Sequence, residues 1–410
     1  MCDSATMLAP SPADSEAAPS PAALTRFLII VGFCGFASAL SMRTLDPVMP
    51  LIAVEFERSV VEVALLTTWF TFFYAFGQPI LGPIGDAFSK PRLISLALVA
   101  MSATTAVAAA AGSFGLFSVA RGLTGIGAGG VIPLVIAMIG DRFPYEQRQV
   151  ALARFMVATL TGQIMGGLAS GVLSPLIGWR GVLSVIAAIA GVSGIVFYLA
   201  MGRRDVSKRR PFSIGQAIAN YRDILANPRA LPLYLLVACE GALAFGFFPY
   251  VAAILLARDG ATSVEAGIVI TGYAIGGMIF AFSAKWILKS LGEKGMIRLG
   301  GVILCLCFLL FSIPAPWWTA LPIFMMIGFG VYNIHNNLQT QATTLSETAR
   351  GSSVALFACL LFAGSACGPP LVGLLMRLAG ESGALLLYAA GVLALGLSAP
   401  RLLKLDRKAN

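Results

Sequence analysis

Long apolar segments recur along the chain from residue 26 onward, separated by short polar or charged stretches. Each is about 20 residues or longer, the length that a helix needs to cross ~30 Å of hydrocarbon. The pattern predicts twelve membrane-spanning helices, at approximately residues 26–53, 63–84, 92–112, 114–139, 151–176, 182–201, 231–257, 264–288, 296–313, 318–343, 353–378 and 384–402. The fourth and fifth connections are weakly bounded, so eleven or thirteen spans remain alternatives.

The composition excludes a water-soluble fold. Of the 410 residues, 58% are hydrophobic and only 11% are charged, whereas soluble domains carry ~25% charged residues. We therefore predict an all-α integral membrane protein with the lipid bilayer as a partner. Residues 1–25 are rich in Ala, Ser and Pro and contain acidic but no basic residues, unlike a signal peptide, so we expect a disordered tail there.

Basic residues are distributed unequally between the connections. One side of the membrane would carry Arg26, Lys90, Arg92, Arg142, Arg148, Arg154, the cluster at 203–210, Arg222, Arg229, Lys285, Lys289, Lys294, Arg298, Arg350 and the tail from Arg401. The other side would carry only Arg58, Arg180, Arg258 and Arg377. Because positive charge concentrates in cytoplasmic loops, we predict cytoplasmic termini in a cell membrane, or in the inner membrane if the organism has two. These loops account for the net charge of +9, and we expect no nucleic-acid partner.

The polar residues are too few for an enzyme or a metal centre. Every cysteine except Cys2 lies within an apolar span, and Cys305 and Cys307 have the wrong spacing for one helical face. A single histidine and no acidic cluster leave too little for nucleophilic or metal catalysis. No glycine-rich segment ends in Gly-Lys-Ser/Thr, as an ATP-binding loop does. We expect no metal, no cofactor and no catalysis.

The two halves of the chain resemble each other. The segments that begin at Arg148 and Arg350 align at a constant offset, which pairs Gly162 with Gly364, Gly166 with Gly368 and Gly171 with Gly373. Self-similarity of this kind is typical of an internal repeat. It predicts two six-helix halves joined by a basic linker.

Three motifs carry a resemblance to a known family. They are the loop "GPIGDAFSKPRL" with Gly82, Asp86, Lys90 and Arg92, the segment "RGLTGIGAGG" with Arg121 and Gly125, and the fifth span with Gly162, Gly166 and Gly171. In these motifs the sequence resembles the major facilitator superfamily of secondary transporters, and within it the drug or metabolite:proton antiporters. Ala87, Ser89 and Gly167 depart from the family pattern, which has a base, a glycine and a proline there; the matching proline is Pro369 in the second half.

The resemblance implies a domain organisation and a set of moving parts. It implies a monomer of two pseudo-symmetric six-helix bundles, with a tail at 1–25, bundles at 26–202 and 231–403, a cytoplasmic linker at 203–230 and a tail at 404–410. The motif residues, together with Gly364 and Gly368, would have gating roles, and Asp86 would lock one state through charge and helix-dipole contacts. The alternatives are ordinary close packing for the glycines and a solvated loop acid for Asp86.

Five acidic, basic or histidine residues lie well inside the predicted spans, away from the span ends. They are Arg43 and Asp46 in span one, Arg121 in span four, Glu240 in span seven and His335 in span ten. Such residues are costly in a membrane and usually face a cavity, and in the family these four spans line the central one. We expect the end of span one to face a water-filled path.

We expect Asp46 to pair with Arg121, with Arg43 or with both, leaving a charge of +1 that could receive an anionic group of a substrate. The alternative is that Arg43 extends to the headgroups with Asp46 as a surface partner. Glu240 is the first candidate for proton coupling, ahead of Asp46, and His335 could relay protons or bind substrate. Structural hydrogen bonds are the alternative for Glu240 and His335.

Uncharged polar residues near these positions are candidates for the substrate cavity. They are Tyr332, Asn336 and Gln339 in span ten and Trp69, Tyr74 and Gln78 in span two. For span two, packing or lipid contact is the alternative.

We predict a proton-coupled secondary transporter that exports a small organic molecule by alternating access. A proton-coupled uptake symporter or a uniporter is the alternative, and a passive channel or a scaffold is less favoured because neither requires titratable groups inside the membrane.

Overall fold

The computed structural model describes residues 21–143, 145–203, 214–346 and 350–405, and within these residues all regular elements are helices. In chain order they are α1 (Pro21–Arg43), η1 (Asp46–Val48), α2 (Met49–Glu55), α3 (Val60–Ala87), α4 (Lys90–Ala110), α5 (Phe114–Arg142), α6 (Tyr145–Phe197), η2 (Tyr198–Gly202), α7 (Ile214–Ala226), α8 (Ala230–Phe245), α9 (Phe248–Asp259), α10 (Ser263–Phe311), η3 (Trp317–Thr319), α11 (Ala320–Thr343) and α12 (Arg350–Leu402). The expected tail at 1–25 is too long, because α1 already begins at Pro21. Residues 1–20 and 406–410 lie outside the described part.

Three helices are too long for one membrane crossing. α6, α10 and α12 contain 53, 49 and 53 residues, which is more than twice the ~20 residues needed to span the hydrocarbon. Each contains one glycine with positive φ, where the helix turns back: Gly178 (φ 69°), Gly292 (φ 63°) and Gly380 (φ 71°). Side chains are strongly disfavoured in this backbone region. All three glycines lie in predicted connections between spans.

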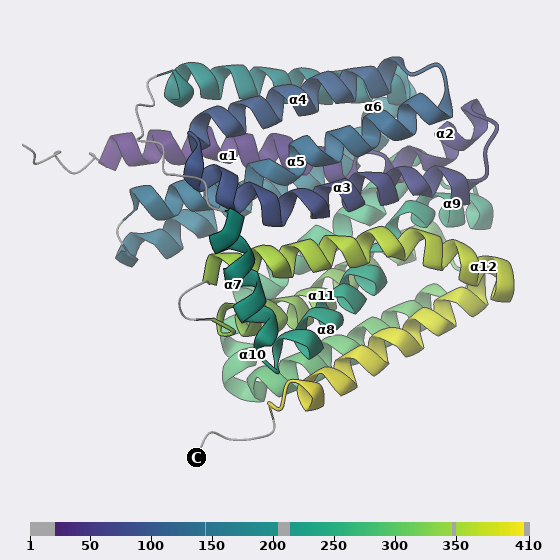
Figure 1. Cartoon of the computed structure of the whole chain (residues 1–410). Helices are drawn as coiled ribbons and strands as arrows, with labels where there is room; N and C mark the ends of the chain where they lie inside the picture. Colours follow the sequence, from purple (N-terminus) through teal and green to yellow (C-terminus); the bar gives the residue numbers. More distant parts are fainter. Residues whose placement is uncertain (1–20, 144, 204–213, 347–349, 406–410) are drawn as a thin grey trace, which may run out of the picture.

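The number of crossings agrees with the sequence pattern. In the described part, nine helical segments are long and apolar enough to cross a membrane. Since the segments that contain α6, α10 and α12 each cross twice, the chain makes the twelve predicted crossings. Figure 1 shows α1 beginning and α12 ending at the same end of the molecule, as an even number of crossings requires. We call this the termini end, and the other the opposite end.

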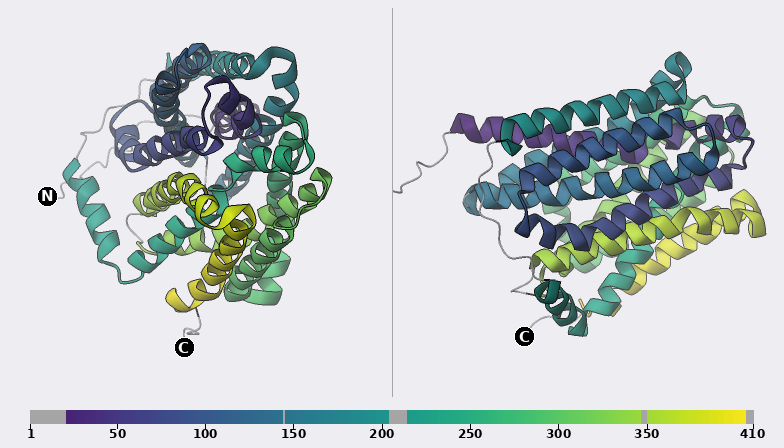
Figure 2. Two further views of the ribbon diagram at one scale, coloured as in Figure 1. Left: turned by 90° about the vertical axis from the view of Figure 1, so that its right-hand side faces the viewer. Right: turned by 45° about the horizontal axis from the view of Figure 1, so that its top comes forward.

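The crossings form two bundles that lie side by side (Figures 1 and 2). The N-bundle comprises α1 to η2, and the C-bundle comprises α8 to α12. The predicted linker contains α7, which lies at the termini end across the two bundles. The Tyr221 hydroxyl of α7 donates to the Pro79 carbonyl of α3 at 2.9 Å, and burial raises the pKa of this tyrosine above its ordinary value, which keeps the hydroxyl a donor.

Backbone contacts within the two bundles repeat at the offset of the sequence repeat. Gly162 of α6 lies against the backbone of Phe36 in α1, and Gly364 of α12 lies against the backbone of Ala238 in α8. Both members of the second pair are 202 residues beyond their counterparts in the first. The fold is therefore duplicated at the level of individual helix contacts.

Helix breaks occur at equivalent places in the first and seventh crossings. α1 ends at Arg43 and α2 starts at Met49, with Pro47 in the short helix between them. α8 ends at Phe245 and α9 starts at Phe248, with Pro249 in its first turn. Proline is accepted at the start of a helix but not in its interior, so each proline fixes where the second helical piece begins.

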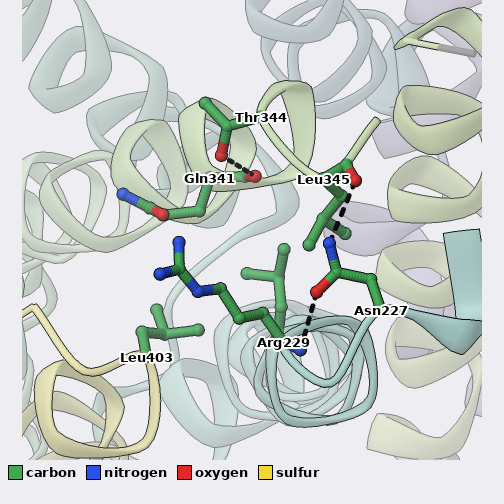
Figure 3. A pocket seen from close by; sticks show the side chains of 7 residues that line it. Asn227, Arg229, Gln341, Thr344, Leu345 and Leu403 are labelled. Atoms are coloured by element: carbon green, nitrogen blue, oxygen red, sulfur yellow. Dashed lines mark hydrogen bonds between the residues drawn. The ribbon is translucent and has the colours of Figure 1, made fainter. Parts of the chain in front are cut away.

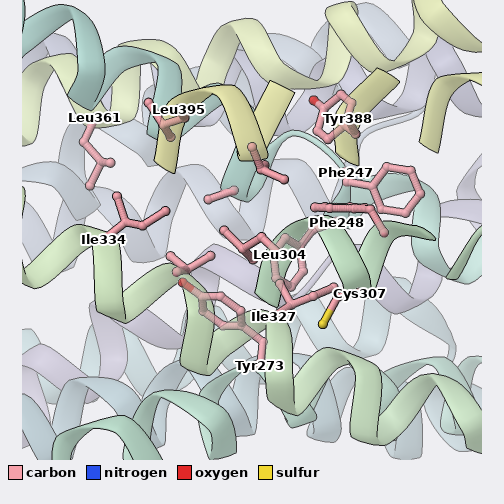
Figure 4. Close-up of a cluster of buried hydrophobic side chains, with 14 of the residues drawn as sticks. Phe247, Phe248, Tyr273, Leu304, Cys307, Ile327, Ile334, Leu361, Tyr388 and Leu395 are labelled. Atoms are coloured by element: carbon pink, nitrogen blue, oxygen red, sulfur yellow. The ribbon is translucent and has the colours of Figure 1, made fainter. Parts of the chain in front are cut away.

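The core of the C-bundle reaches the second break. Phe247 and Phe248 project into the same apolar cluster as Tyr273, Leu304 and Tyr388 (Figure 4). The ring of Phe248 packs edge-on against that of Tyr273, with 5.1 Å between the centroids. This packing holds the second break firmly against α10.

The two bundles are in contact at the opposite end. Gly171 of α6 lies so close to α10 that a Cβ there would be 2.5 Å from the Ser263 carbonyl oxygen. One turn away, the hydroxyls of Ser174 and Ser263 are 3.0 Å apart. Close approach of this kind requires small side chains on both helices. The opposite end is therefore closed.

Candidate functional site

The charges of the first break are paired and buried. A guanidinium nitrogen of Arg43 lies 3.4 Å from a carboxylate oxygen of Asp46, and the two side chains are 10% and 1% exposed. The predicted pairing of Asp46 with Arg43 is thus confirmed, and extension of Arg43 to the headgroups is wrong. Both side chains are buried in this conformation, and the expected water-filled path beside them stays a prediction.

Aromatic rings of the other bundle cover Arg43. The guanidinium carbon of Arg43 is 3.9 Å from the ring centroid of Phe248 and 5.1 Å from that of Phe245. A cation over an aromatic face is attracted by the ring quadrupole, and the attraction is largest where water is excluded. Arg43 is therefore a charged contact between the bundles.

Phe245 and Phe248 are site residues that the sequence reasoning missed. The offset of 202 residues that relates the glycines also relates Arg43 to Phe245, Asp46 to Phe248 and Pro47 to Pro249. Applying the repeat to the charged stretch of span one would have identified both rings. The repeat could not have shown that the two equivalent stretches touch each other.

Arg121 of α5 is also buried, at 2% exposure. It donates to the Ser41 carbonyl at 3.4 Å, and its guanidinium carbon is 4.4 Å from the ring centroid of Phe70. Within the described residues, no direct hydrogen bond joins Arg121 to Asp46, although the two charges lie within the range of Coulombic interaction. The predicted direct pairing of these two residues is therefore not observed.

A second buried carboxylate, with a histidine as its partner, lies in the C-bundle. Nδ1 of His335 in α11 is 3.1 Å from Oε1 of Glu240 in α8, and Glu240 is 2% exposed. The imidazole also packs against the ring of Phe357, with 5.3 Å between centroids. The sequence analysis named both residues but did not pair them, because 95 positions separate them in the chain.

The predicted cavity residues divide into buried and exposed groups. The Gln78 amide donates to the Gly129 carbonyl at 2.9 Å, and the Tyr74 ring packs 4.3 Å from that of Phe362 in the other bundle. Both make packing contacts in this conformation, and their role in lining the cavity stays a prediction. Trp69 is 45% exposed.

The polar residues of α11 lie next to His335. Tyr332 is partly buried and stacks against Phe280 at 6.1 Å. Asn336 and Gln339 are exposed and follow His335 toward the termini end. A cavity role for these three residues stays a prediction.

The residues of the signature loop that the structure describes connect helices at the termini end. Lys90 of α4 forms an ion pair with Asp141 of α5 at 2.7 Å. Arg92 donates to the Gly202 carbonyl at 3.1 Å. The side chain of Asp86 and the surroundings of Gly82 lie outside the described residues.

Most of the predicted gating glycines make packing contacts inside one bundle. Gly125 lies against the Phe70 backbone, Gly166 against Leu40 and Gly368 against Gly246, in the same manner as Gly162 and Gly364. Gly171 differs, because it contacts α10 of the other bundle. Among the predicted glycines that the structure describes, it alone is placed to respond when the bundles move.

A small pocket lies at the termini end of the C-bundle (Figure 3). Its volume is about 90 Å³, and it is lined by Asn227, Arg229, Leu233, Gln341, Thr344, Leu345 and Leu403. Sites for drug-sized molecules are typically ~300–1,000 Å³. The pocket lies about two helical turns from the Glu240–His335 pair along α8 and α11, since its lining includes Leu233 and Gln341. It is too small to be the principal substrate site. The described residues contain no cluster of potential metal ligands.

Known proteins match this chain in both sequence and fold. The sequence profile of the Major Facilitator Superfamily matches residues 31–349 and 233–410. The chain is 25% identical over 329 residues to the uncharacterized MFS-type transporter YwfA of Bacillus subtilis (strain 168), a match that covers 78% of each protein. It is 28% identical over 134 residues to the probable efflux pump mfs2 of Aspergillus flavus, covering 33% of this chain and 32% of the pump.

Solved structures share the fold at low sequence identity. A bacterial homologue of the human lysosomal transporter Spinster, in an inward-facing and unoccupied conformation, gives a TM-score of 0.71 at 19% identity over 94% of this chain and 96% of that chain. The nucleoside transporter NupG gives 0.73 at 16% identity over 94% and 100%. At these identities, the likeness concerns the fold.

Proposed function

The chain belongs to the Major Facilitator Superfamily, and we propose that it is a proton-coupled secondary transporter that exports a small organic molecule by alternating access. The buried charged side chains of the two duplicated bundles support this proposal. The observation that carries it is the Glu240–His335 pair, because the carboxylate is almost fully buried and its hydrogen-bond partner is itself titratable.

The pair is suited to exchange protons. Imidazole is the side chain whose charge ordinarily changes between pH 5 and 8, and the Glu240 carboxylate lies within hydrogen-bond distance of it. Oε1 of Glu240 contacts His335, whereas Oε2 has no hydrogen-bond partner among the described residues. That second oxygen is free to receive a proton or a donor group of the substrate.

Asp46 is the second candidate for proton coupling. Its partner Arg43 is permanently charged. The Arg43–Asp46 pair therefore contains a fixed cation, whereas the partner of Glu240 is a histidine, which can lose its charge. Proton uptake at Asp46 would leave Arg43 held by the rings of Phe245 and Phe248. We therefore assign the principal proton site to Glu240 with His335.

The direction of transport rests on weaker support. Several relatives are named efflux pumps, but the chain matches only 26–32% of their length. The glycine-rich fifth crossing and the "DRFP" loop at Asp141 also resemble antiporters. Uptake by proton symport would use the same residues with the opposite sign of proton flux. We place the protein as a monomer in the cell membrane, with both termini in the cytoplasm.

The proposal is tested with purified protein in liposomes that contain a pH-sensitive dye. Cationic drugs, sugars, amino acids and organic acids are added in turn under an imposed proton gradient. We expect a substrate-dependent proton flux that falls by at least about tenfold in Glu240→Gln, which corresponds to ~1.4 kcal/mol. The flux should fall less in Asp46→Asn. The sign of the flux separates export from import.

Glu293→Gln is the matched control. It also removes one carboxylate of the C-bundle, but Glu293 accepts from Gln341 at the termini end, away from the Glu240–His335 pair. Its proton flux should equal that of the unmodified protein. Substrate movement without proton flux, unchanged in Glu240→Gln and Asp46→Asn, would overturn proton coupling and indicate a uniporter.

A further inference from the structure

The buried charges of the two bundles have opposite signs. Arg43 and Arg121 outnumber Asp46 in the N-bundle, and both interact electrostatically with that carboxylate. Among the described residues of the C-bundle, the titratable side chain paired with Glu240 is His335. The N-bundle cluster carries a net charge of +1. The C-bundle cluster carries −1 when the His335 imidazole is neutral.

Two tyrosines connect the clusters. The hydroxyls of Tyr273 in α10 and Tyr332 in α11 each lie within Coulombic range of both Arg43 and Glu240, and their rings are 6.0 Å apart. Arg43 of the positive cluster and Glu240 of the negative cluster therefore both act on these two hydroxyls of the C-bundle.

Each cluster also has an unused bonding atom in this conformation. Nε of Arg121 and Oδ1 of Asp46 in the N-bundle and Oε2 of Glu240 in the C-bundle are buried, and none has a hydrogen-bond partner among the described residues. A buried donor or acceptor without a partner costs free energy, more so when the group is charged. A ligand that supplies an acceptor to Arg121 and a donor to Glu240 removes the costs at these two residues.

We propose that the substrate is a small dipolar molecule that carries an anionic group and a protonated amine. This inference rests on the proposed transport function. The anionic group binds on the Arg121 side and the amine on the Glu240 side. Arg43 is less available than Arg121, because it is already paired with Asp46 and covered by two rings.

The charge balance favours a dipolar ligand over a singly charged one. The four ionised residues Arg43, Asp46, Arg121 and Glu240 sum to zero, and a zwitterion leaves the sum at zero. A ligand with only an amine leaves the net positive charge of the N-bundle cluster without a partner, and a ligand with only a carboxylate leaves Glu240 without one. In a region of low dielectric constant, such unpaired charges are strongly unfavourable, so each wrong ligand is rejected by repulsion as well as by lost contacts.

The test measures binding to the purified full-length protein by thermal stabilisation and by competition among ligands. The probes are phenylalanine, alanylphenylalanine and ω-amino acids of increasing chain length, which vary the distance between amine and carboxylate. Each is compared with its methyl ester, which lacks the anion, and its N-acetyl form, which lacks the cation. We expect at least one dipolar probe to bind, with either blocked form weaker by about tenfold or more.

Variants assign the two ends of the ligand. Arg121→Gln should weaken the dipolar probe to the level of its ester and leave the ester unchanged. Glu240→Gln should weaken it to the level of the N-acetyl form. Arg229→Gln, which removes an arginine of the small pocket at the termini end, should have no effect. If Arg121→Gln fails to fold, Arg121→Lys keeps the charge and should retain the preference for the dipolar probe over its ester.

The proposal fails if no dipolar probe binds, or if the esters or the N-acetyl forms bind as tightly as their parents. Proton-driven transport of another compound class would then leave the proposed function standing without this inference. Binding of a dipolar probe with no accompanying proton flux would support this inference and contradict proton coupling.

Discussion

Two helix breaks meet at the interface of the bundles, one after α1 and one after α8. They are equivalent in the repeat, and each has a proline at the start of the next helical piece, Pro47 in one and Pro249 in the other. Where the first break has Arg43 and Asp46, the second has Phe245 and Phe248. The backbone geometry was kept in both halves, whereas the side chains became a buried ion pair in one and a pair of rings in the other.

The difference between the breaks has a physical consequence. A buried cation needs contacts that replace its lost hydration, and aromatic faces provide such contacts. Arg43 finds these faces in the other bundle, so it is covered only while the opposite end is closed. Two identical breaks, both charged or both aromatic, would lack this complementarity.

The largest effect is expected from removing the cation of the first break. Arg43→Met leaves Asp46 buried without its partner and should lower the free energy of unfolding by about 3–5 kcal/mol. Arg43→Met/Asp46→Leu removes both charges and should recover most of that loss. Thermal unfolding of the purified protein in detergent measures both. Equal destabilisation of the single and double variants would contradict the account.

Substitutions at the bends Gly178 and Gly380 should lower stability by similar amounts, whereas substitutions at the two breaks should not. A Cβ at either position meets no other atom within 4 Å, so Gly178→Ala and Gly380→Ala should each cost only the backbone strain of positive φ, about 1–3 kcal/mol. Unfolding measurements on the two variants check this. A clear difference between them would show that one bend is held by contacts that the other lacks.

The rings of the second break should contribute unequally. Phe248 lies closer to the Arg43 guanidinium than Phe245 does, at 3.9 against 5.1 Å. The coupling energy between Arg43 and Phe248, measured in a double-mutant cycle with Phe248→Leu, should be about 2 kcal/mol, and that with Phe245→Leu about 0.5–1 kcal/mol. Equal couplings would mean that packing alone, and not the cation, sets the value.

The smallest effects are expected at two ion pairs of the opposite end. In one bundle the first crossing supplies the acid of the pair, and in the other bundle it supplies the base. Arg180 pairs with Glu55 and donates to the Ala109 carbonyl. Arg258 pairs with Glu381 and donates to the Phe311 carbonyl, which is the repeat equivalent of Ala109 at the same offset of 202 residues. The acid thus lies on the first crossing of the N-bundle, and the base lies on the first crossing of the C-bundle.

The Arg258 side chain is 9% exposed, whereas that of Arg180 is 34% exposed. Arg258→Ala should therefore lower stability by about 1 kcal/mol and Arg180→Ala by less, since solvent weakens exposed pairs. High salt should reduce the effect of Arg180→Ala further. A larger loss for Arg180→Ala would contradict the order given by burial.

Much of the architecture follows from the apolar pattern. The lengths of the spans predicted twelve crossings, and glycines in the predicted connections mark the bends of α6, α10 and α12. The constant offset predicted the duplicated bundles. These features could be predicted because a membrane leaves the backbone few alternatives to long helices. The start of α1 was missed because its first turn, residues 21–25, continues the Ala- and Pro-rich composition of the preceding stretch.

The candidate site was predicted as a set of residues but not as an arrangement. The sequence by itself determined that Arg43, Asp46, Arg121, Glu240 and His335 lie inside spans, because charge within an apolar segment is visible without coordinates. Only the tertiary structure decided that Glu240 contacts His335, that Arg121 does not contact Asp46 directly and that two rings cover Arg43. The physical reason is that rotation and tilt of each helix are set by packing against its neighbours, and no single span encodes that packing.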